Sequence, residues 1–276
     1  MYSFFNLNFK SDLDLSAIGC AKSENKNCDV NINLKKETPT LPNCEYSIGQ
    51  NYSYFNKKNI ALYEVINGCQ INIYPKKNFS VPIAAETLLN FPLALCMSQR
   101  GYFVLHAATV YKNNICATFA GKSHSGKSTI AYGLKKFGWS IISEDITVID
   151  TKKMLVLPSY PYIKLSDEAK NRFCMQDLEK LQKIKLSRSG YLMKKDAFET
   201  HQPQHIFFLN WQNKINVTRI SMANALRNLF KFSFVCDSIE DSKKIVKFSG
   251  NCSFYSLDRP KNLDSIEQIS KILEKI

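Results

Sequence analysis

The sequence lacks the features that mark membrane and secreted proteins. No apolar run approaches the roughly 18 residues that a membrane-spanning helix needs, and the first residues do not pair a basic stretch with an apolar one, as a secretory signal does. The nine Cys show no Cys-x-x-Cys spacing, which argues against a disulfide framework and a zinc site. We therefore expect a cytoplasmic protein with no membrane partner, in which most cysteines are small buried residues.

Nucleic-acid-binding motifs are also missing, although the chain is basic. It has 37 Lys and Arg against 24 Asp and Glu, a net charge of +13, and most of the excess falls after residue 100. No zinc-finger spacing, RNP-like aromatic signature or Arg-rich tract accompanies this charge. We expect it to attract a nucleotide and an acidic partner, not a nucleic acid.

The distribution of apolar runs predicts two domains. Residues 1–84 contain short strand-like runs separated by turns, including two runs around Asn67-Gly68, a dipeptide typical of hairpins. This part is expected to be a β-rich domain that could recognise a substrate. Residues 85–276 are expected to form the catalytic domain. The helical spacing from Pro82 to Gln99 should be kinked or divided at Pro92.

Residues 121–129 carry the strongest motif, because "GKSHSGKST" matches G-x-x-x-x-G-K-[ST]. A β-rich run, "NICATFA", precedes it, and the helical pattern "STIAYGLKKFG" and a second apolar run, "WSIISEDITVID", follow. Strand, glycine-rich loop, helix and strand in this order predict a phosphate-binding loop in an α/β (α+β) fold. Further amphipathic patterns predict helices over residues 167–184, 221–232 and 263–276.

The chemistry of such a loop assigns a role to most of its residues. The glycines let backbone N–H groups converge on phosphate oxygens at a helix N-terminus. Lys127 would reach the β- and γ-phosphates, Ser128 would bind Mg²⁺, and Thr129 would support the loop from behind. His124 is expected to be solvated. The predicted nucleotide-binding residues are Gly121, Lys122, Ser123, His124, Ser125, Gly126, Lys127, Ser128 and Thr129.

Two adjacent acids could complete a phosphoryl-transfer site. Glu144 and Asp145 end an apolar run, where one carboxylate could hold Mg²⁺ and the other could take a proton from an attacking hydroxyl. Either residue could instead cap a turn. His106 lies within the apolar run "VLHAATV", where a single His is most often a core residue.

Residues 101–150 together resemble the catalytic core of the HPr serine kinase family. The match is closer to its shorter relatives, the peptide kinases found near modified-peptide biosynthesis genes. It comprises a His in the first strand, a hairpin, the phosphate loop, a helix, and a strand that ends in two acids. Weaker similarity continues through "LPSYPYIKL" and "FYSLDRP". The resemblance implies a core like that of phosphoenolpyruvate carboxykinase, ATP as donor, and a homo-oligomer.

The resemblance also implies catalytic roles. His106 would orient or polarise the acidic pair, Glu144 would be the base, and Asp145 would bind Mg²⁺, with the last two roles open to exchange. The chain departs from the family in two places, since HPr kinases usually have Glu in place of Thr129 and Asp in place of Glu144. The downstream segment associated with reverse phosphorolysis is not found. Neither phosphorylase activity nor HPr as the substrate is therefore expected.

The sequence thus predicts an ATP- and Mg²⁺-dependent kinase acting on a Ser or Thr hydroxyl of a protein or small peptide, which could be the precursor of a modified peptide. Two alternatives stay open. The acceptor could be a small molecule such as free serine, or the chain could be a nucleotide-dependent peptide-binding module without catalysis.

Overall fold

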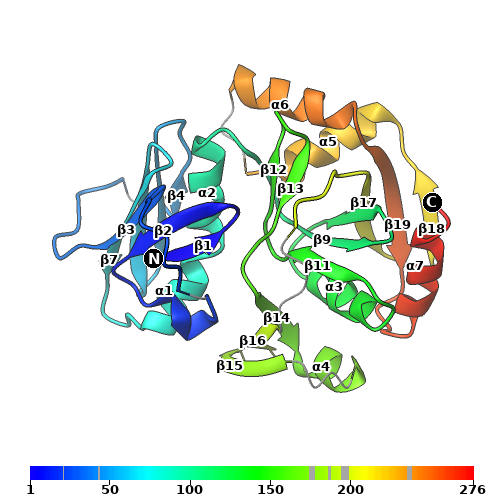
Figure 1. The fold of residues 1–276 in the computed structure, drawn as a ribbon, viewed down its shortest axis with the longest axis horizontal. Coiled ribbons are helices and arrows are strands. Elements are labelled where there is room, and N and C mark those ends of the chain that lie inside the picture. Colours follow the sequence, from blue (N-terminus) through cyan, green and yellow to red (C-terminus); the bar gives the residue numbers. More distant parts are fainter. Residues whose placement is uncertain (21, 43, 174–177, 186–187, 194–198, 235–237) are drawn as a thin grey trace.

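The computed structural model shows a mixed α and β protein whose described residues form four sheets (Figure 1). The structure describes the chain except residues 21, 43, 174–177, 186–187, 194–198 and 235–237. The α+β character expected from the sequence is confirmed.

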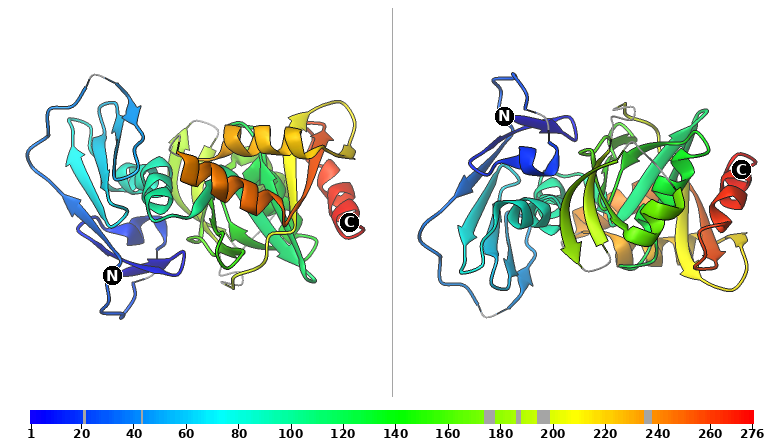
Figure 2. Two further views of the ribbon diagram at one scale, coloured as in Figure 1. Left: turned by 90° about the horizontal axis from the view of Figure 1, so that it is seen from above. Right: turned by 90° about the horizontal axis from the view of Figure 1, so that it is seen from below.

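The first sheet has seven strands and lies at one end of the molecule (Figures 1 and 2). Its order is β1-β2-β3-β7-β6-β5-β4, and a short 3₁₀ helix, η1 (Leu15–Ile18), follows β2. Asn67 and Gly68 both have positive φ and join β6 to β7 as the predicted hairpin. The strands are β1 (Tyr2–Phe4), β2 (Leu7–Ser11), β3 (Val30–Leu34), β4 (Tyr46–Ser47), β5 (Tyr52–Lys57), β6 (Ala61–Ile66) and β7 (Gln70–Pro75).

Two helices, α1 (Val81–Leu88) and α2 (Phe91–Gln99), lie between the first sheet and the rest of the chain (Figure 2). Pro92 stands in the first turn of α2, so the apolar stretch is divided as expected. Contrary to the sequence-based expectation, the stretch Val81–Gln99 is, by length and composition alone, long and apolar enough to cross a membrane, although it is divided between α1 and α2. In its 18-residue window, 61% is buried inside the protein, and the core helix of a soluble protein passes the same test.

One hydrophobic core joins α1 and α2 both to the first sheet and to the second half of the chain. It contains residues of the first sheet, most buried residues of α1 and α2, and residues from the second half such as Val104 and Val148. The domain boundary predicted after residue 84 falls inside α1, and the division into two domains stays a prediction.

The central sheet has six strands in the order β11-β9-β10-β17-β19-β18. Helices α3 (Lys127–Lys135) and α7 (Ser265–Leu273) cover one face, and α5 (Met222–Phe232) and α6 (Ile239–Ser249) cover the other (Figure 1). Strands β10, β17 and β19 are parallel, so their carboxyl ends lie at one edge. The strands are β9 (Ala107–Lys112), β10 (Ile115–Ala120), β11 (Ser140–Ser143), β17 (His205–Trp211), β18 (Asn216–Arg219) and β19 (Ser253–Arg259).

Two smaller sheets flank the central one. Their orders are β13-β12-β8 and β14-β16-β15, and helix α4 (Asp167–Phe173) follows β14. The strands are β8 (Phe103–Leu105), β12 (Thr147–Asp150), β13 (Leu155–Leu157), β14 (Tyr162–Ser166), β15 (Leu178–Lys185) and β16 (Arg188–Met193).

The structure corrects some expectations about elements. The helix predicted over residues 167–184 is wrong in its second half, because Leu178–Lys185 pairs with β16 as a strand, and tertiary pairing overrides local propensity. Residues 174–177, between the two elements, lie outside the described residues. The helices predicted over 221–232 and 263–276 are confirmed as α5 and α7. The buried-cysteine expectation holds for Cys20, Cys96 and Cys116, whereas Cys28, Cys44 and Cys69 are exposed.

Candidate active site

Two apolar runs that the sequence predicts as single strands each divide between two sheets. Residues 103–112 form β8 and β9 with His106 at the break, and residues 140–150 form β11 and β12 with Glu144 and Asp145 at the break. Since β8 pairs with β12 and β9 pairs with β11, the two runs pass from one sheet to the other at neighbouring positions. This brings His106 close to Asp145. The sequence predicted that His106 lies in the interior of a strand. In the structure it lies instead between the two strands β8 and β9.

Residues 121–126 connect β10 to α3 at the edge where the parallel strands end. Gly126 has a φ of 85° and caps the helix, which begins at Lys127. The Lys127 side chain is 6% exposed, and its Nζ donates to the backbone oxygens of Gly121 and Lys122, both at 3.0 Å. A Cβ on Gly121 would lie 2.7 Å from Ser125 Oγ and 3.2 Å from Ser125 Cβ, so a larger residue there would require the Ser125 side chain to shift.

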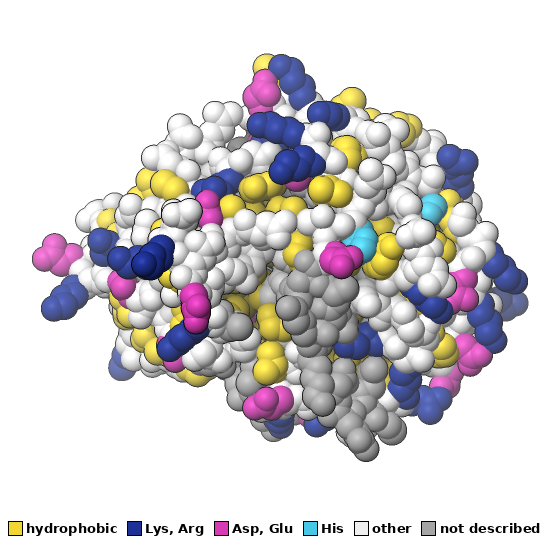
Figure 3. Space-filling model, viewed as in Figure 1, with side chains coloured by type: hydrophobic (Ala, Val, Ile, Leu, Met, Phe, Trp, Pro, Cys, Tyr) yellow, Lys and Arg dark blue, Asp and Glu magenta, His cyan; other side chains and the backbone are white. Residues whose placement is uncertain are grey.

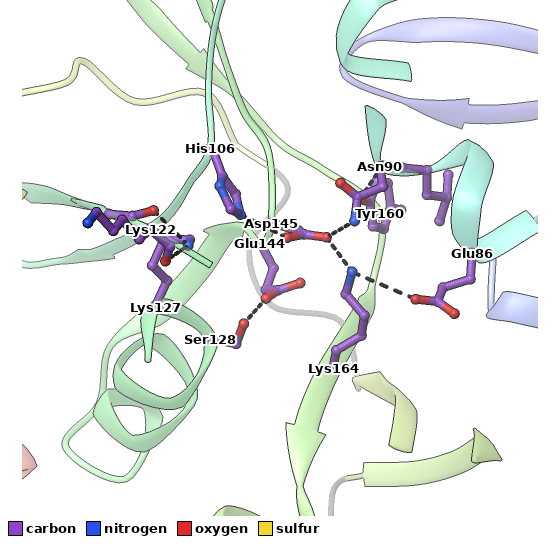
Figure 4. A network of polar contacts seen from close by, with 12 residues as sticks. Glu86, Asn90, His106, Lys122, Lys127, Ser128, Glu144, Asp145, Tyr160 and Lys164 are labelled. Atoms are coloured by element: carbon purple, nitrogen blue, oxygen red, sulfur yellow. Dashed lines mark hydrogen bonds and ion pairs between the residues drawn. The ribbon is translucent and has the colours of Figure 1, made fainter. Parts of the chain in front are cut away.

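The two adjacent acids point in different directions (Figure 4). Glu144 is 1% exposed, and its Oε1 accepts a hydrogen bond from the Ser128 hydroxyl in the first turn of α3. Asp145 has a φ of 65° and turns away from α3 toward His106 and Lys164. A change of backbone region between neighbours lets two consecutive carboxylates serve separate surroundings.

Asp145 lies among three donors. Its Oδ1 is 3.5 Å from His106 Nε2, its Oδ2 accepts from Asn90 Nδ2 at 2.5 Å, and the same oxygen forms an ion pair with the Lys164 ammonium. Burial by itself raises the pKa of Asp145, but the positive charge of Lys164 and the contact with His106 outweigh it and lower that pKa well below its ordinary range. Asp145 is therefore ionised at neutral pH.

The segment between the first sheet and the central sheet reaches this site. Asn90, at the junction of α1 and α2, contacts Asp145 directly, and Glu86 of α1 lies 3.8 Å from Lys164 Nζ. The hydroxyl of buried Tyr160 donates to the Leu89 carbonyl at 2.7 Å and holds the same junction. These contacts tie the position of Asp145 to helices that pack on the first sheet.

A cavity of about 730 Å³ opens over these groups. Carboxylate, imidazole, ammonium and guanidinium groups line it together with the indole of Trp211. Its lining residues are Asn90, His106, Ser123, His124, Gly126, Lys127, Ser128, Thr129, Asp145, Lys164, Ser166, Glu168, Trp211, Arg259, Lys261 and Leu263. In the part of the chain that the structure describes, no three His, Cys, Asp or Glu side chains cluster as a metal site.

Most residues predicted for the site lie around this cavity. Thr129, which was expected behind the loop, lines the cavity, and so does His124. Lys122 and Ser125 line a neighbouring cavity of about 600 Å³, which shares Ser123 with the first one. The sequence also suggests that the basic segment 183–195 could close over the nucleotide or hold an acidic substrate, and this segment lies partly outside the described residues.

Sequence reasoning missed Glu86, Asn90, Lys164 and Arg259. Arg259 ends β19 and Trp211 ends β17, so both reach the edge at which β10 enters the 121–126 loop. The carboxyl ends of parallel strands are a usual place for ligands. The sequence signal that could have identified Arg259 was therefore its position at the end of a strand-like run, as for Trp211. Glu86, Asn90 and Lys164 carry no comparable signal, since only packing brings them to Asp145.

Comparisons with known proteins find little similarity. No protein-family model matches the chain, and no curated protein matches it. Among solved structures, the Hpr(Ser) kinase/phosphatase from Coxiella burnetii has a TM-score of 0.33 and 9% identity, covering 62% of this chain and 88% of that chain. At this level of similarity the match does not identify a family for the chain.

Proposed function

We propose that the chain is an ATP-dependent kinase that transfers a phosphoryl group to a Ser or Thr hydroxyl of a protein or small peptide. The observation that carries this proposal is the division of the two adjacent acids, one beside Ser128 of α3 and the other beside His106 and Lys164. Phosphoryl transfer needs oxygen ligands that hold a metal ion next to the phosphates, and it needs a carboxylate near the attacking hydroxyl.

The Ser128 hydroxyl and the Glu144 carboxylate fit Mg²⁺, which is usually held by few protein oxygens together with substrate phosphates. Bound there, Mg²⁺ would offset the charge on the β- and γ-phosphates. Asp145 is already engaged by Lys164 and His106, which favours it as the group facing the acceptor. The proposal therefore exchanges the two roles first inferred from the resemblance, with Glu144 on the metal side and Asp145 as the base.

The other residues act on the nucleotide and the acceptor. The first backbone N–H groups of α3 and the Lys127 ammonium would hold the phosphates. The acceptor oxygen attacks the γ-phosphorus, the bond to the β-phosphate oxygen breaks, and the hydroxyl proton passes to Asp145. Since Lys164 makes Asp145 a weak base, Asp145 orients the hydroxyl and takes its proton late, which suits the loose transition state of phosphoryl transfer.

Mass spectrometry tests this function directly. The protein is incubated with ATP, Mg²⁺ and a library of Ser- and Thr-containing peptides, and Lys127→Ala serves as the inactive comparison. A gain of one phosphoryl group that Lys127→Ala abolishes supports a peptide kinase. Phosphorylation of free serine alone would point to a small-molecule kinase. Nucleotide binding without transfer to any acceptor would favour the non-catalytic module.

A further inference from the structure

Arg259 is a buried cation that the proposed reaction does not yet use. It is 1% exposed and ends strand β19. Its Nη2 donates to the backbone oxygens of Ser125 at 3.2 Å and Gly126 at 3.4 Å, its Nη1 donates to that of Pro260 at 3.5 Å, and its Nε has no hydrogen-bond partner. Among the described residues no carboxylate pairs with it. The guanidinium thus lies against the 121–126 loop without a counter-charge.

Such an arrangement is unfavourable in a protein without a ligand. Burial lowers the pKa of Arg259 to about 10, because the charged form has lost its water. A buried charge without an opposite charge destabilises the folded state, and three carbonyl oxygens replace only part of the lost hydration. Where a fold keeps a group of this kind in a cavity, a ligand of opposite charge is the expected partner.

The surroundings of Arg259 favour an anion. The guanidinium carbon stacks 4.1 Å from the centre of the Trp211 ring, and Lys261 Nζ lies 5.9 Å from the same ring centre. All three residues line the same cavity as Lys127 and Ser128. The stack restricts the rotamers of Arg259, so the group is preorganised.

We propose that Arg259, stacked on Trp211 and assisted by Lys261, forms a second anion subsite of this cavity, and that the subsite binds a phosphate group of a polyphosphate ligand. That this ligand is the nucleoside triphosphate rests on the proposed kinase function. The anion subsite itself rests only on the buried charge. The competing interpretation is that Arg259 braces the loop through the Ser125 and Gly126 carbonyls.

Thermal unfolding separates the two interpretations. The probe is inorganic tripolyphosphate, and the variants are Arg259→Met, Arg259→Lys and the matched control Arg219→Met, which removes an exposed Arg from the neighbouring strand β18. If Arg259 forms an anion subsite, the Arg259→Met variant without tripolyphosphate should unfold at the same temperature as the wild type or at a higher one, because an unpaired charge has been removed. It also loses most of the rise in Tm that tripolyphosphate gives the wild type.

Tryptophan fluorescence gives a second readout, independent of activity. The chain has two Trp, of which Trp211 is 36% exposed in the cavity and Trp139 is buried and donates to Ser270. Tripolyphosphate should change the emission of Trp211, and Trp139→Phe should keep that change. Arg259→Met should weaken tripolyphosphate binding at least about tenfold, Arg259→Lys should weaken it less, and adenosine binding should not change.

The outcomes are distinct. A lower Tm of Arg259→Met without the anion, combined with wild-type tripolyphosphate affinity, would overturn the subsite in favour of the brace. If Arg259→Met does not fold, Arg259→Lys takes its place. A lower Tm without the anion together with wild-type tripolyphosphate affinity in Arg259→Lys would then overturn the subsite. Anion binding that depends on Arg259, in a protein that transfers no phosphoryl group, would uphold the subsite and refute the kinase.

Discussion

At the scale of single residues, Asp145 and Glu144 differ in what they contact, although they are neighbours in the chain. In the proposed reaction, Asp145→Asn would remove the proton acceptor but keep the size of the side chain, so we expect kcat to fall by about 100-fold or more with nucleotide affinity retained. Glu144→Gln should instead raise the Mg²⁺ concentration needed for half-maximal activity. Steady-state kinetics across a Mg²⁺ series measures both effects. Matching Mg²⁺ dependence in the two variants would contradict the division of roles.

Gly126 is the loop position that tolerates a side chain least. Its φ is 85°, and an added Cβ would lie 2.0 Å from Arg259 Nη2 and 3.1 Å from the Trp211 ring. Gly138 is a matched control, because its φ is 80° but the nearest atom to an added Cβ is 3.6 Å away.

We expect Gly138→Ala to lower the free energy of unfolding by about 1 kcal/mol, from the strained backbone alone. Gly126→Ala should lower it further, because Arg259 must also move. It should weaken tripolyphosphate binding as well, which Gly138→Ala should not. Urea denaturation measures the first effect and titration the second. Equal losses of stability in the two variants would show that Arg259 is not held against Gly126.

At the scale of elements, Lys164 of β14 connects the Asp145 turn to α1. Lys164→Met leaves Asp145 buried beside Asn90 and His106 without its strongest positive neighbour. Breaking a buried ion pair costs about 3–5 kcal/mol of the free energy of unfolding near neutral pH. The exposed pair of Lys271 with Glu267 gives a control, in which Lys271→Met should have no measurable effect.

The pH dependence of this loss follows from the direction of the pKa shift. The folded-state pKa of Asp145 is depressed, so the stability that its ionised form contributes is present above the unfolded value of about 3.8 and is lost as pH falls below it. Wild type and Lys164→Met should therefore differ most near neutral pH and converge in acid. Urea denaturation at pH 7 and pH 3 measures this. A difference that is the same at both pH values would contradict the ion-pair explanation.

At the scale of the whole molecule, the first sheet and the cavity beside the 121–126 loop are connected through α1 and α2. The hydrophobic core that these helices share with the first sheet also contains Val104, Ile146 and Val148. We therefore expect a fragment of residues 101–276 to unfold without a sharp transition, since that core surface would be exposed and Asn90 would be missing. Calorimetry and nucleotide titration of the fragment test this. Cooperative unfolding with full-length affinity would show that the second half is independent.

Basic side chains are not confined to the surroundings of the cavity. On the face shown in Figure 3, Lys and Arg side chains lie at the top, where α6 lies in Figure 1, and also along both sides. Exposed Ile239 and Val246 stand on the same helix. The net charge therefore comes partly from a surface away from the cavity, and it is a weaker argument for a phosphate ligand than the composition suggested.

Local chemistry explains the elements that could be predicted from the sequence. Asn67-Gly68 and Asn113-Asn114 adopt positive φ in their hairpins, Pro92 divides two helices, and α3 starts directly after Gly126. Helix α6 could have been predicted too, because Ser238 and Asp241 form an N-terminal capping pair. In each case residues within a few positions of one another determine the backbone.

The sequence by itself determined the glycine-rich motif at residues 121–128 and the presence of two acids after an apolar run. Only the tertiary structure decided that Glu144 turns to Ser128 while Asp145 turns to His106 and Lys164, and that Asn90 and Arg259 join the cavity. The physical reason is that sheet pairing fixes these contacts. Strands that change sheets at the same level, and parallel strands that end at one edge, bring together residues far apart in the chain, which no local pattern encodes.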